Sequence, residues 1–205
     1  MFVKICGITN EDDALLSVAM GADAVGFNFY PHSPRYVEPD AALPIRLSLP
    51  PFLAAVGVFV DAAPEEVRRV MERCKLDYAQ LHGRETPYIV GKLGGLRIIK
   101  AIRVRDENDL SELERFNVEA FLLDTYVPAR PGGTGETFDW DLARAASSRA
   151  KVILAGGLTP DNVAEAVRRA RPFAVDVASG VEEEPGVKSR KLVMDFVRAA
   201  KSVNL

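Results

Sequence analysis

Eight short apolar segments alternate with segments of helical periodicity along the 205 residues of the chain. The run over residues 53–60 is continuously apolar, which is typical of a strand that is buried on both faces of a parallel sheet. Strands are predicted over residues 2–6, 24–29, 53–60, 78–81, 97–104, 120–123, 152–154 and 174–177. Helices are predicted over residues 11–20, 41–48, 64–74, 86–93, 107–116, 139–146, 160–170 and 189–202.

Several of these helices carry boundary signals of their own. Asn10 and Thr159 are predicted N-caps, because their short polar side chains can accept a hydrogen bond from a free backbone N–H. Pro64 and Pro160 suit the first helical turn, where a missing N–H does no harm. Gly21 is a suitable C-terminal stop.

Eight strand–helix units at a mean spacing of about 25 residues predict a single (β/α)8 barrel domain over residues 1–205. The alternative is an open, doubly wound sheet. Two observations favour the barrel: the first strand is not followed by a Gly-x-Gly-x-x-Gly turn, and eight parallel units close more naturally than they stay open.

Composition excludes several classes of function. A net charge of −3 without a basic tail or stripe argues against nucleic acid as a partner. No apolar run approaches the roughly 18 residues that a membrane span needs, and no signal-peptide pattern precedes the first strand. Cys6 and Cys74 lie far apart without metal-type spacing, so we expect a reduced, cytoplasmic enzyme. A single glutamine beside abundant arginine favours a thermophilic source.

The carboxyl ends of the strands are where a barrel of this kind does its chemistry. Cys6 ends the first strand; it is either a small buried hydrophobe or a reactive thiol at the barrel mouth. Asp124 follows four apolar residues. It is either a cap or ion-pair partner, or a general acid whose pKa is raised by the desolvated mouth of the barrel. His82 ends the fourth strand, where hydrogen bonding and catalysis are both open. Cys74, on the outer ring, is predicted to be structural.

Three loops add candidate binding groups. Arg35 lies on a loop stiffened by flanking prolines, which suits a carboxylate or phosphate clamp better than an ordinary surface position. The turns after strands seven and eight contain Gly156, Gly157, Ser179 and Gly180, at the place where barrels often bind phosphate through backbone N–H groups. The run 132–135 predicts a mobile loop near the mouth, either a lid or a substrate contact.

Together these motifs resemble one family. They occur in the order Lys4-Ile5-Cys6-Gly7, Ser33-Pro34-Arg35-Tyr36-Val37, Gln80-Leu81-His82-Gly83, Leu123-Asp124, Gly132-Gly133-Thr134-Gly135, Ala155-Gly156-Gly157-Leu158 and Asp176-Val177-Ala178-Ser179-Gly180-Val181-Glu182. Along its whole length the chain closely resembles phosphoribosylanthranilate isomerase of tryptophan biosynthesis. The resemblance implies an Amadori rearrangement of N-(5-phosphoribosyl)anthranilate to 1-(2-carboxyphenylamino)-1-deoxyribulose 5-phosphate, with neither a metal ion nor an organic cofactor.

The resemblance also implies roles for individual residues. Asp124 is the general acid on the ribose ring oxygen, and Cys6 is the general base at ribose C2. Arg35 holds the anthranilate carboxylate, and the phosphate sits on Gly156, Gly157, Ser179 and Gly180. His82, Gly135 and Asp176 are further substrate contacts. Asn28 departs from the family pattern, because many relatives are expected to have a more apolar residue there, and this difference touches the pocket. Because a free thiol is mostly protonated at neutral pH, we predict a positive group near Cys6; Lys4 is not assigned to this role because it lies early on the strand.

Other assignments share parts of this pattern. A ribulose-phosphate epimerase would use His and Asp metal ligands at the strand ends, and His82 is the only such histidine. An indole-glycerol-phosphate synthase would use catalytic lysines, and Lys100 has no convincing partner. A barrel that binds a phosphoribosyl ligand without turnover is the non-enzymatic alternative. The chain is predicted to be a monomer or a homodimer, with Pro50, Pro51 and Phe52 as candidate interface residues.

Overall fold

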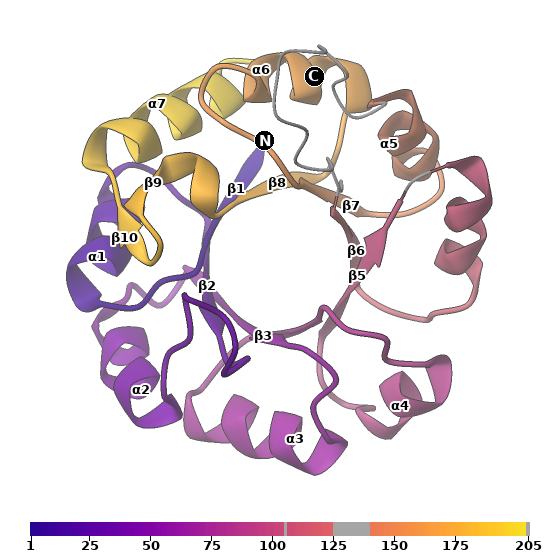
Figure 1. The fold of residues 1–205 in the computed structure, drawn as a ribbon, viewed down its shortest axis with the longest axis horizontal. Helices are drawn as coiled ribbons and strands as arrows, with labels where there is room; N and C mark the ends of the chain where they lie inside the picture. Colours follow the sequence, from indigo (N-terminus) through magenta and orange to yellow (C-terminus); the bar gives the residue numbers. More distant parts are fainter. Residues whose placement is uncertain (105, 125–139, 204–205) are drawn as a thin grey trace.

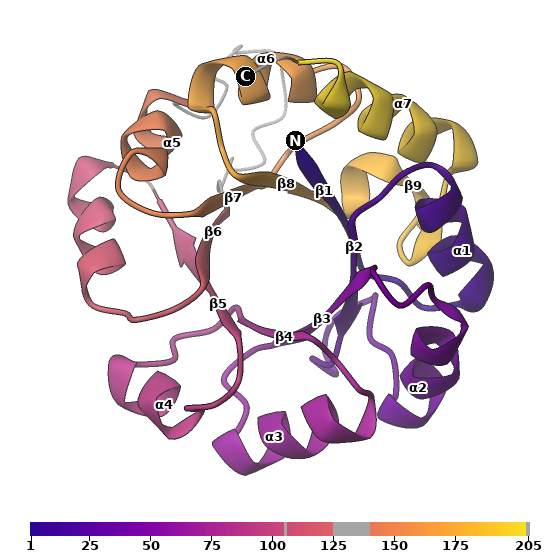
Figure 2. The same cartoon turned by 180° about the vertical axis from the view of Figure 1, so that it is seen from behind.

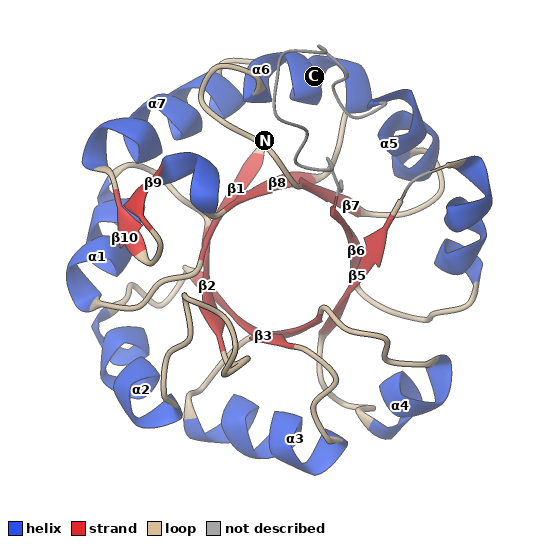
Figure 3. Cartoon of the chain, viewed as in Figure 1, coloured by secondary structure: helices blue, strands red, loops and turns tan. Residues whose placement is uncertain are grey.

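The computed structural model describes residues 1–104, 106–124 and 140–203. Eight parallel strands close into a barrel in chain order, and the helices surround it as an outer ring (Figures 1 and 3). The strands are β1 (Phe2–Cys6), β2 (Ala24–Asn28), β3 (Ala54–Phe59), β4 (Tyr78–Leu81), β5 (Ile98–Arg103), β6 (Ala120–Asp124), β7 (Val152–Ala155) and β8 (Ala174–Val177). The predicted (β/α)8 barrel is confirmed. Closure follows from the pairing of β1 with both β2 and β8, which leaves no edge strand.

The outer ring differs in detail from the prediction. Its helices are α1 (Glu11–Ala19), α2 (Pro39–Ser48), α3 (Pro64–Arg73), α4 (Pro87–Lys92), α5 (Trp140–Ser147), α6 (Val163–Ala170) and α7 (Arg190–Lys201). Between β5 and β6 the chain forms a 3-10 helix, η1 (Glu107–Glu114), in place of the predicted α-helix. Its residues Leu110 and Leu113 are both buried. An interval of three residues puts both on one face of a helix with three residues per turn.

The boundary signals were right for α1 and α3 and wrong for α6. Asn10 accepts a hydrogen bond from the N–H of Asp13, and Pro64 opens α3. Thr159 does not cap a helix; its N–H donates instead to Asn162 Oδ1 at 2.8 Å, and Asn162 Nδ2 donates to Gly157 O. This side-chain bridge folds residues 157–162 into a turn, so α6 begins only at Val163.

A small hairpin after β8 was not predicted. A 3-10 turn, η2 (Ser179–Val181), leads into β9 (Glu182–Glu184), which pairs with β10 (Val187–Lys188) across Gly186 at φ +88°. The hairpin lies beside α1 and β1 (Figure 1). Two contacts fix it there: Thr9 Oγ1 donates to Gly186 O at 2.7 Å, and the N–H of Lys188 donates to Asp13 Oδ2 at 2.9 Å.

Strand alternation divides the core into two parts. Outward side chains such as Val3, Ile5 and Leu81 pack under the helices. Inward side chains form a smaller apolar cluster inside the barrel: Val56, Ile99, Ala101, Ala120, Leu122, Ile153, Ala155 and Ala174. The last inward positions of several strands are polar, and this end of the barrel therefore offers a reactive surface. No helix in the described ranges is long and apolar enough to span a membrane.

Candidate active site

A cavity of about 230 Å³ opens at the carboxyl ends of the strands. It is lined by nearly every residue that the sequence put forward: Cys6, Asn28, Arg35, His82, Asp124, Gly156, Gly157, Asp176, Ser179 and Gly180. Gly135 lies outside the described residues. Gln80, which was not among the predicted site residues, lines the cavity as well. The fold thus gathers residues from β1, β4, β6, β7 and β8 and from the loop after β2 into one site.

The Cys6 thiol is buried at the end of β1 and lies beside a cation. Burial raises the pKa of Cys6, and the ammonium group of Lys4 opposes that rise through charge and a hydrogen bond. Both side chains lie over Gly26: a Cβ there would stand 2.8 Å from Cys6 Sγ and 3.1 Å from Lys4 Nζ. The predicted positive group near Cys6 is confirmed, and it is Lys4. Residues two apart on a strand share a face, and this signal was available in the sequence.

Asp176 faces the same interior space from β8 and forms an ion pair with Lys4. Lys4 Nζ donates to Asp176 Oδ1 at 2.9 Å, and the two side chains are only 4% and 9% exposed. Burial alone would lower the pKa of Lys4, but the carboxylate of Asp176 raises it well above its ordinary value. Lys4 therefore stays charged beneath the thiol.

Asp124 forms a hydrogen-bonded chain with two residues of the β4 end. His82 Nε2 lies 3.1 Å from Asp124 Oδ2, and Gln80 Nε2 lies 3.1 Å from His82 Nδ1. The hydrogen bond from His82 lowers the pKa of Asp124; burial opposes this effect, and the charge of Arg103 adds to it. The expected rise in the pKa of Asp124 is therefore wrong. A partly exposed mouth desolvates the carboxyl group less than the imidazole N–H stabilises the carboxylate.

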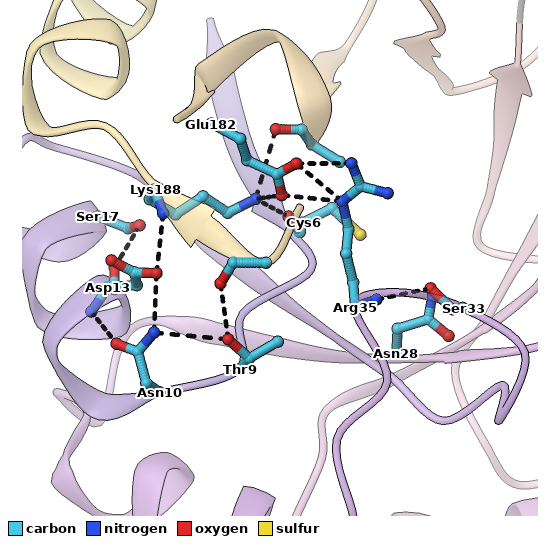
Figure 4. A network of polar contacts seen from close by, with 12 residues as sticks. Cys6, Thr9, Asn10, Asp13, Ser17, Asn28, Ser33, Arg35, Glu182 and Lys188 are labelled. Atoms are coloured by element: carbon cyan, nitrogen blue, oxygen red, sulfur yellow. Dashed lines mark hydrogen bonds and ion pairs between the residues drawn. The ribbon is translucent and has the colours of Figure 1, made fainter. Parts of the chain in front are cut away.

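Arg35 is held in a network that joins the β2 loop to the hairpin after β8 (Figure 4). Its Nε and Nη2 donate to Glu182 at 2.8 and 2.6 Å, and Lys188 Nζ donates to the same carboxylate at 2.6 Å. Lys188 also donates to Cys6 O at 2.6 Å. Glu182 and Lys188 were given no role from the sequence, because their contacts depend on the unpredicted hairpin.

The glycine turns approach each other closely at the ends of β7 and β8. Gly156 and Gly157 adopt φ values of +80° and +63°, which L side chains rarely take. A Cβ on Gly180 would stand 1.9 Å from Leu158 O, so the two turns fit only with glycine there. This leaves room for a ligand to meet the backbone of both turns, as the phosphate prediction requires. In the described part of the chain, no group of three or more His, Cys, Asp or Glu side chains is placed to hold a metal ion.

Comparison with known proteins gives consistent results. The family model for N-(5'-phosphoribosyl)anthranilate (PRA) isomerase matches residues 3–199. The N-(5'-phosphoribosyl)anthranilate isomerase of Geobacter sp. (strain M21) is 52% identical, with 98% of each chain covered, and that of Rubrobacter xylanophilus is 51% identical, again with 98% of each covered. The phosphoribosyl anthranilate isomerase structure of Thermotoga maritima has a TM-score of 0.91 at 45% identity, covering 99% of this chain and 100% of the other.

A second solved phosphoribosyl anthranilate isomerase contains reduced 1-(o-carboxyphenylamino)-1-deoxyribulose 5-phosphate. It has a TM-score of 0.88 at 42% identity, covering 99% of this chain and all of the other. A Thermus thermophilus structure is also similar, with a TM-score of 0.86 at 42% identity and coverage of 98% and 99%.

Proposed function

The chain belongs to the N-(5'-phosphoribosyl)anthranilate isomerase family, and from this premise we propose which of its residues carry out the reaction. The enzyme class and its place in tryptophan biosynthesis follow from the family. We assign the general base to Cys6 and the general acid to Asp124. One observation carries this assignment: a single cavity brings the two side chains together between the glycine turns and Arg35.

The substrate is anchored at its two anionic ends. The phosphate takes the turns that contain Gly156, Gly157, Ser179 and Gly180, where glycine lets the backbone come close. The anthranilate carboxylate takes Arg35, whose Nε and Nη2 already hold Glu182 and whose Nη1 makes no hydrogen bond within the described residues. Asp176, His82 and Gly135 complete the substrate contacts.

The chemistry needs one proton delivered and one removed. Asp124 gives its proton to the ribose ring oxygen as the C1–O bond breaks, and the anilino nitrogen lone pair forms the Schiff base. The Cys6 thiolate then takes the proton from C2. The C2–H electron pair becomes the C1–C2 double bond, and the nitrogen takes back its lone pair. The resulting enolamine tautomerises to the aminoketose, so the rearrangement needs no external oxidant or reductant.

In the resting enzyme the proton is on Cys6 and not on Asp124, the reverse of what the reaction needs. Burial raises the pKa of Cys6, and the His82 hydrogen bond lowers the pKa of Asp124, so the favoured state is thiol with carboxylate. The productive state, thiolate with carboxylic acid, has the same number of protons. Its population is therefore constant between the two pKa values. We expect kcat/KM to show a broad pH plateau; a narrow bell would contradict this protonation scheme.

The direct test follows the loss of anthranilate fluorescence with substrate generated in situ. Wild type should turn over, and Cys6→Ala and Asp124→Asn should each lose about 10²- to 10⁴-fold or more in kcat. Cys74→Ala is the matched control, because it removes the other buried thiol at the outer ring. Inactive wild type would contradict the activity itself, whereas a fully active Cys6→Ala would require a different base.

We also propose that the protein is a homodimer joined at the amino-terminal end of the barrel, which Figure 2 shows from that side. Phe2, Phe52 and Phe173 are 53%, 100% and 48% exposed, and they line a hollow of about 330 Å³. Exposed aromatic clusters of this kind are typical of interfaces. One relative is described as a dimeric phosphoribosylanthranilate isomerase. Sedimentation should give a dimer for wild type and a monomer for Phe52→Ser; a wild-type monomer would contradict the proposal.

A further inference from the structure

Gln80 is the only glutamine in the chain, and its side chain is buried inside the barrel beneath the active site. It lies on β4 and is 1% exposed. Its neighbours Ala79 and Leu81 pack outward under the helices, so Gln80 faces inward and lines the cavity with Cys6 and Asp176. A buried amide needs partners for both its N–H₂ and its oxygen.

We propose that Gln80 is a positioning and substrate-binding residue: its amide N–H sets the tautomer of His82, and its amide oxygen accepts a hydrogen bond from a ribose hydroxyl. The inference deepens the proposed function and rests on it, because His82 in turn holds the acid Asp124.

The donor end of the amide fixes the proton on the imidazole. Gln80 Nε2 lies 3.1 Å from His82 Nδ1, and an amide nitrogen can only donate, so Nδ1 must offer its lone pair. A neutral imidazole then carries its proton on Nε2, which lies 3.1 Å from Asp124 Oδ2. If the amide were reversed, Nδ1 would need the proton, and in a neutral ring the Nε2 lone pair would face a carboxylate oxygen. The orientation of Gln80 and the hydrogen bond to Asp124 are thus coupled.

The acceptor end of the amide is unpaired. Among the buried side-chain nitrogen and oxygen atoms of the described residues, Gln80 Oε1 is the one that lacks a hydrogen-bond partner. Leaving such an acceptor unpaired in a low-dielectric site is costly, and a hydroxyl brought by the ligand removes the cost. The ribose is the part of the substrate that carries hydroxyls, and the proposed binding mode puts it between the phosphate turns and Arg35. Ligand binding therefore reinforces the orientation of the amide that holds His82 and Asp124.

The first test reads the tautomer by nitrogen-15 NMR, independently of turnover. The chain has two histidines, His32 and His82, so a long-range proton–nitrogen spectrum of histidine-labelled enzyme at pH 8 contains two rings. His82 should show a protonated Nε2 and an unprotonated Nδ1 in wild type and a mixture of tautomers in Gln80→Met. His82 protonated on Nδ1 in wild type would overturn the proposal.

The second test measures affinity for reduced 1-(o-carboxyphenylamino)-1-deoxyribulose 5-phosphate by calorimetry. Gln80→Met should weaken binding about tenfold and lower kcat by a further tenfold or so, since it loses one hydrogen bond to the ligand and one to His82. Leu81→Met is the control, because it places the same side chain one residue later under the helices. Wild-type affinity in Gln80→Met would overturn the ligand contact. An active Cys6→Ala would instead refute the proposed function and leave the tautomer result standing.

Discussion

Lys188 offers the sharpest test of how the site is held together. Its side chain is fully buried, and its ammonium group donates to Cys6 O and to Glu182, both at 2.6 Å. Lys188→Met keeps the length and most of the volume of the side chain but removes the charge, these two hydrogen bonds and a longer one to Ala178 O at 3.4 Å. The end of β1 and the hairpin after β8 then lose their direct connection.

The expected cost follows from what remains after the substitution. Breaking a buried ion pair by removing one partner costs about 3–5 kcal/mol, because the other charge stays buried. Here Glu182 stays paired with the guanidinium of Arg35, so we expect the loss of stability to be at the lower end of this range, about 3 kcal/mol. Glu182→Gln should cost more, because it leaves two cations side by side, one of them with no exposed surface. For a chain of this length, a loss of about 3 kcal/mol lowers the Tm by about 6–12 °C.

Urea unfolding at pH 7, followed by Trp140 fluorescence and by circular dichroism, measures the free energy of unfolding. Lys191→Met is the matched control: its ammonium group is also paired, with Asp195 at 2.7 Å, but the side chain is 79% exposed. This variant should unfold at nearly the same urea concentration as wild type, because solvent screens an exposed pair. If Lys188→Met lost less than about 1 kcal/mol, the upper end for pairs at a protein surface, the network would not hold the site together as described.

Three more outcomes follow from the same site. Folding lowers the pKa values of Glu182 and Asp124 from their ordinary values of 4.5 and 3.8. Their contribution to stability is therefore present above those ordinary values and is lost as the pH falls through the pKa values of the folded protein. The free energy of unfolding should drop on acidification, and it should drop less in Glu182→Gln. Gly180→Ala, whose Cβ would strike Leu158 O, should raise KM at least about tenfold by disturbing the phosphate turns, whereas Gly91→Ala, with open space around it, should leave KM unchanged. Burial raises the pKa of Cys6, and Lys4 opposes the rise. Iodoacetamide should therefore alkylate Cys6 slowly at pH 7 in a Cys74→Ala background, and more slowly still when Lys4→Met is added. Faster alkylation of the Lys4→Met variant would contradict the role of Lys4.

The barrel could be predicted from the sequence because each of its eight units carries its own local signal. An apolar run, a cap or proline, and a helical stripe recur in order, and closure needs no further information. The carboxyl ends of the strands then identify the site by position, which is why Cys6, His82 and Asp124 could be selected as candidates from the order of the residues alone. The hairpin was missed because Glu182–Glu184 has no strand propensity of its own; β9 forms by pairing with β10.

The pKa shifts and ion pairs of the site were harder to predict than the identity of the residues that form it. The pKa of Asp124 was expected to rise because the barrel mouth is partly desolvated, but the direction of the shift is set by His82, which lies 42 residues earlier in the chain. Strand alternation alone would have placed Lys4 on the inward face with Cys6. It would not have revealed Asp176 as its partner, since that contact depends on the register between β1 and β8.

A third buried lysine shows what such ion pairs do for this enzyme. Lys100 donates to Leu81 O, Gly83 O and Glu85, and Glu85 in turn accepts from the N–H groups of Asp61 and Gly83. Both charged side chains are at most 5% exposed, so the pair fixes the backbone on either side of His82.

Replacing a buried pair with apolar residues of similar size is often neutral or stabilising. The double variant Lys100→Met/Glu85→Leu should therefore unfold within about 2 kcal/mol of wild type while kcat falls about tenfold or more, because His82 loses the frame that aims it at Asp124. If activity survived at wild-type level in the folded double variant, the pair would serve stability alone. A selective loss of kcat would instead show that this barrel uses buried charge to hold strand ends in place for catalysis.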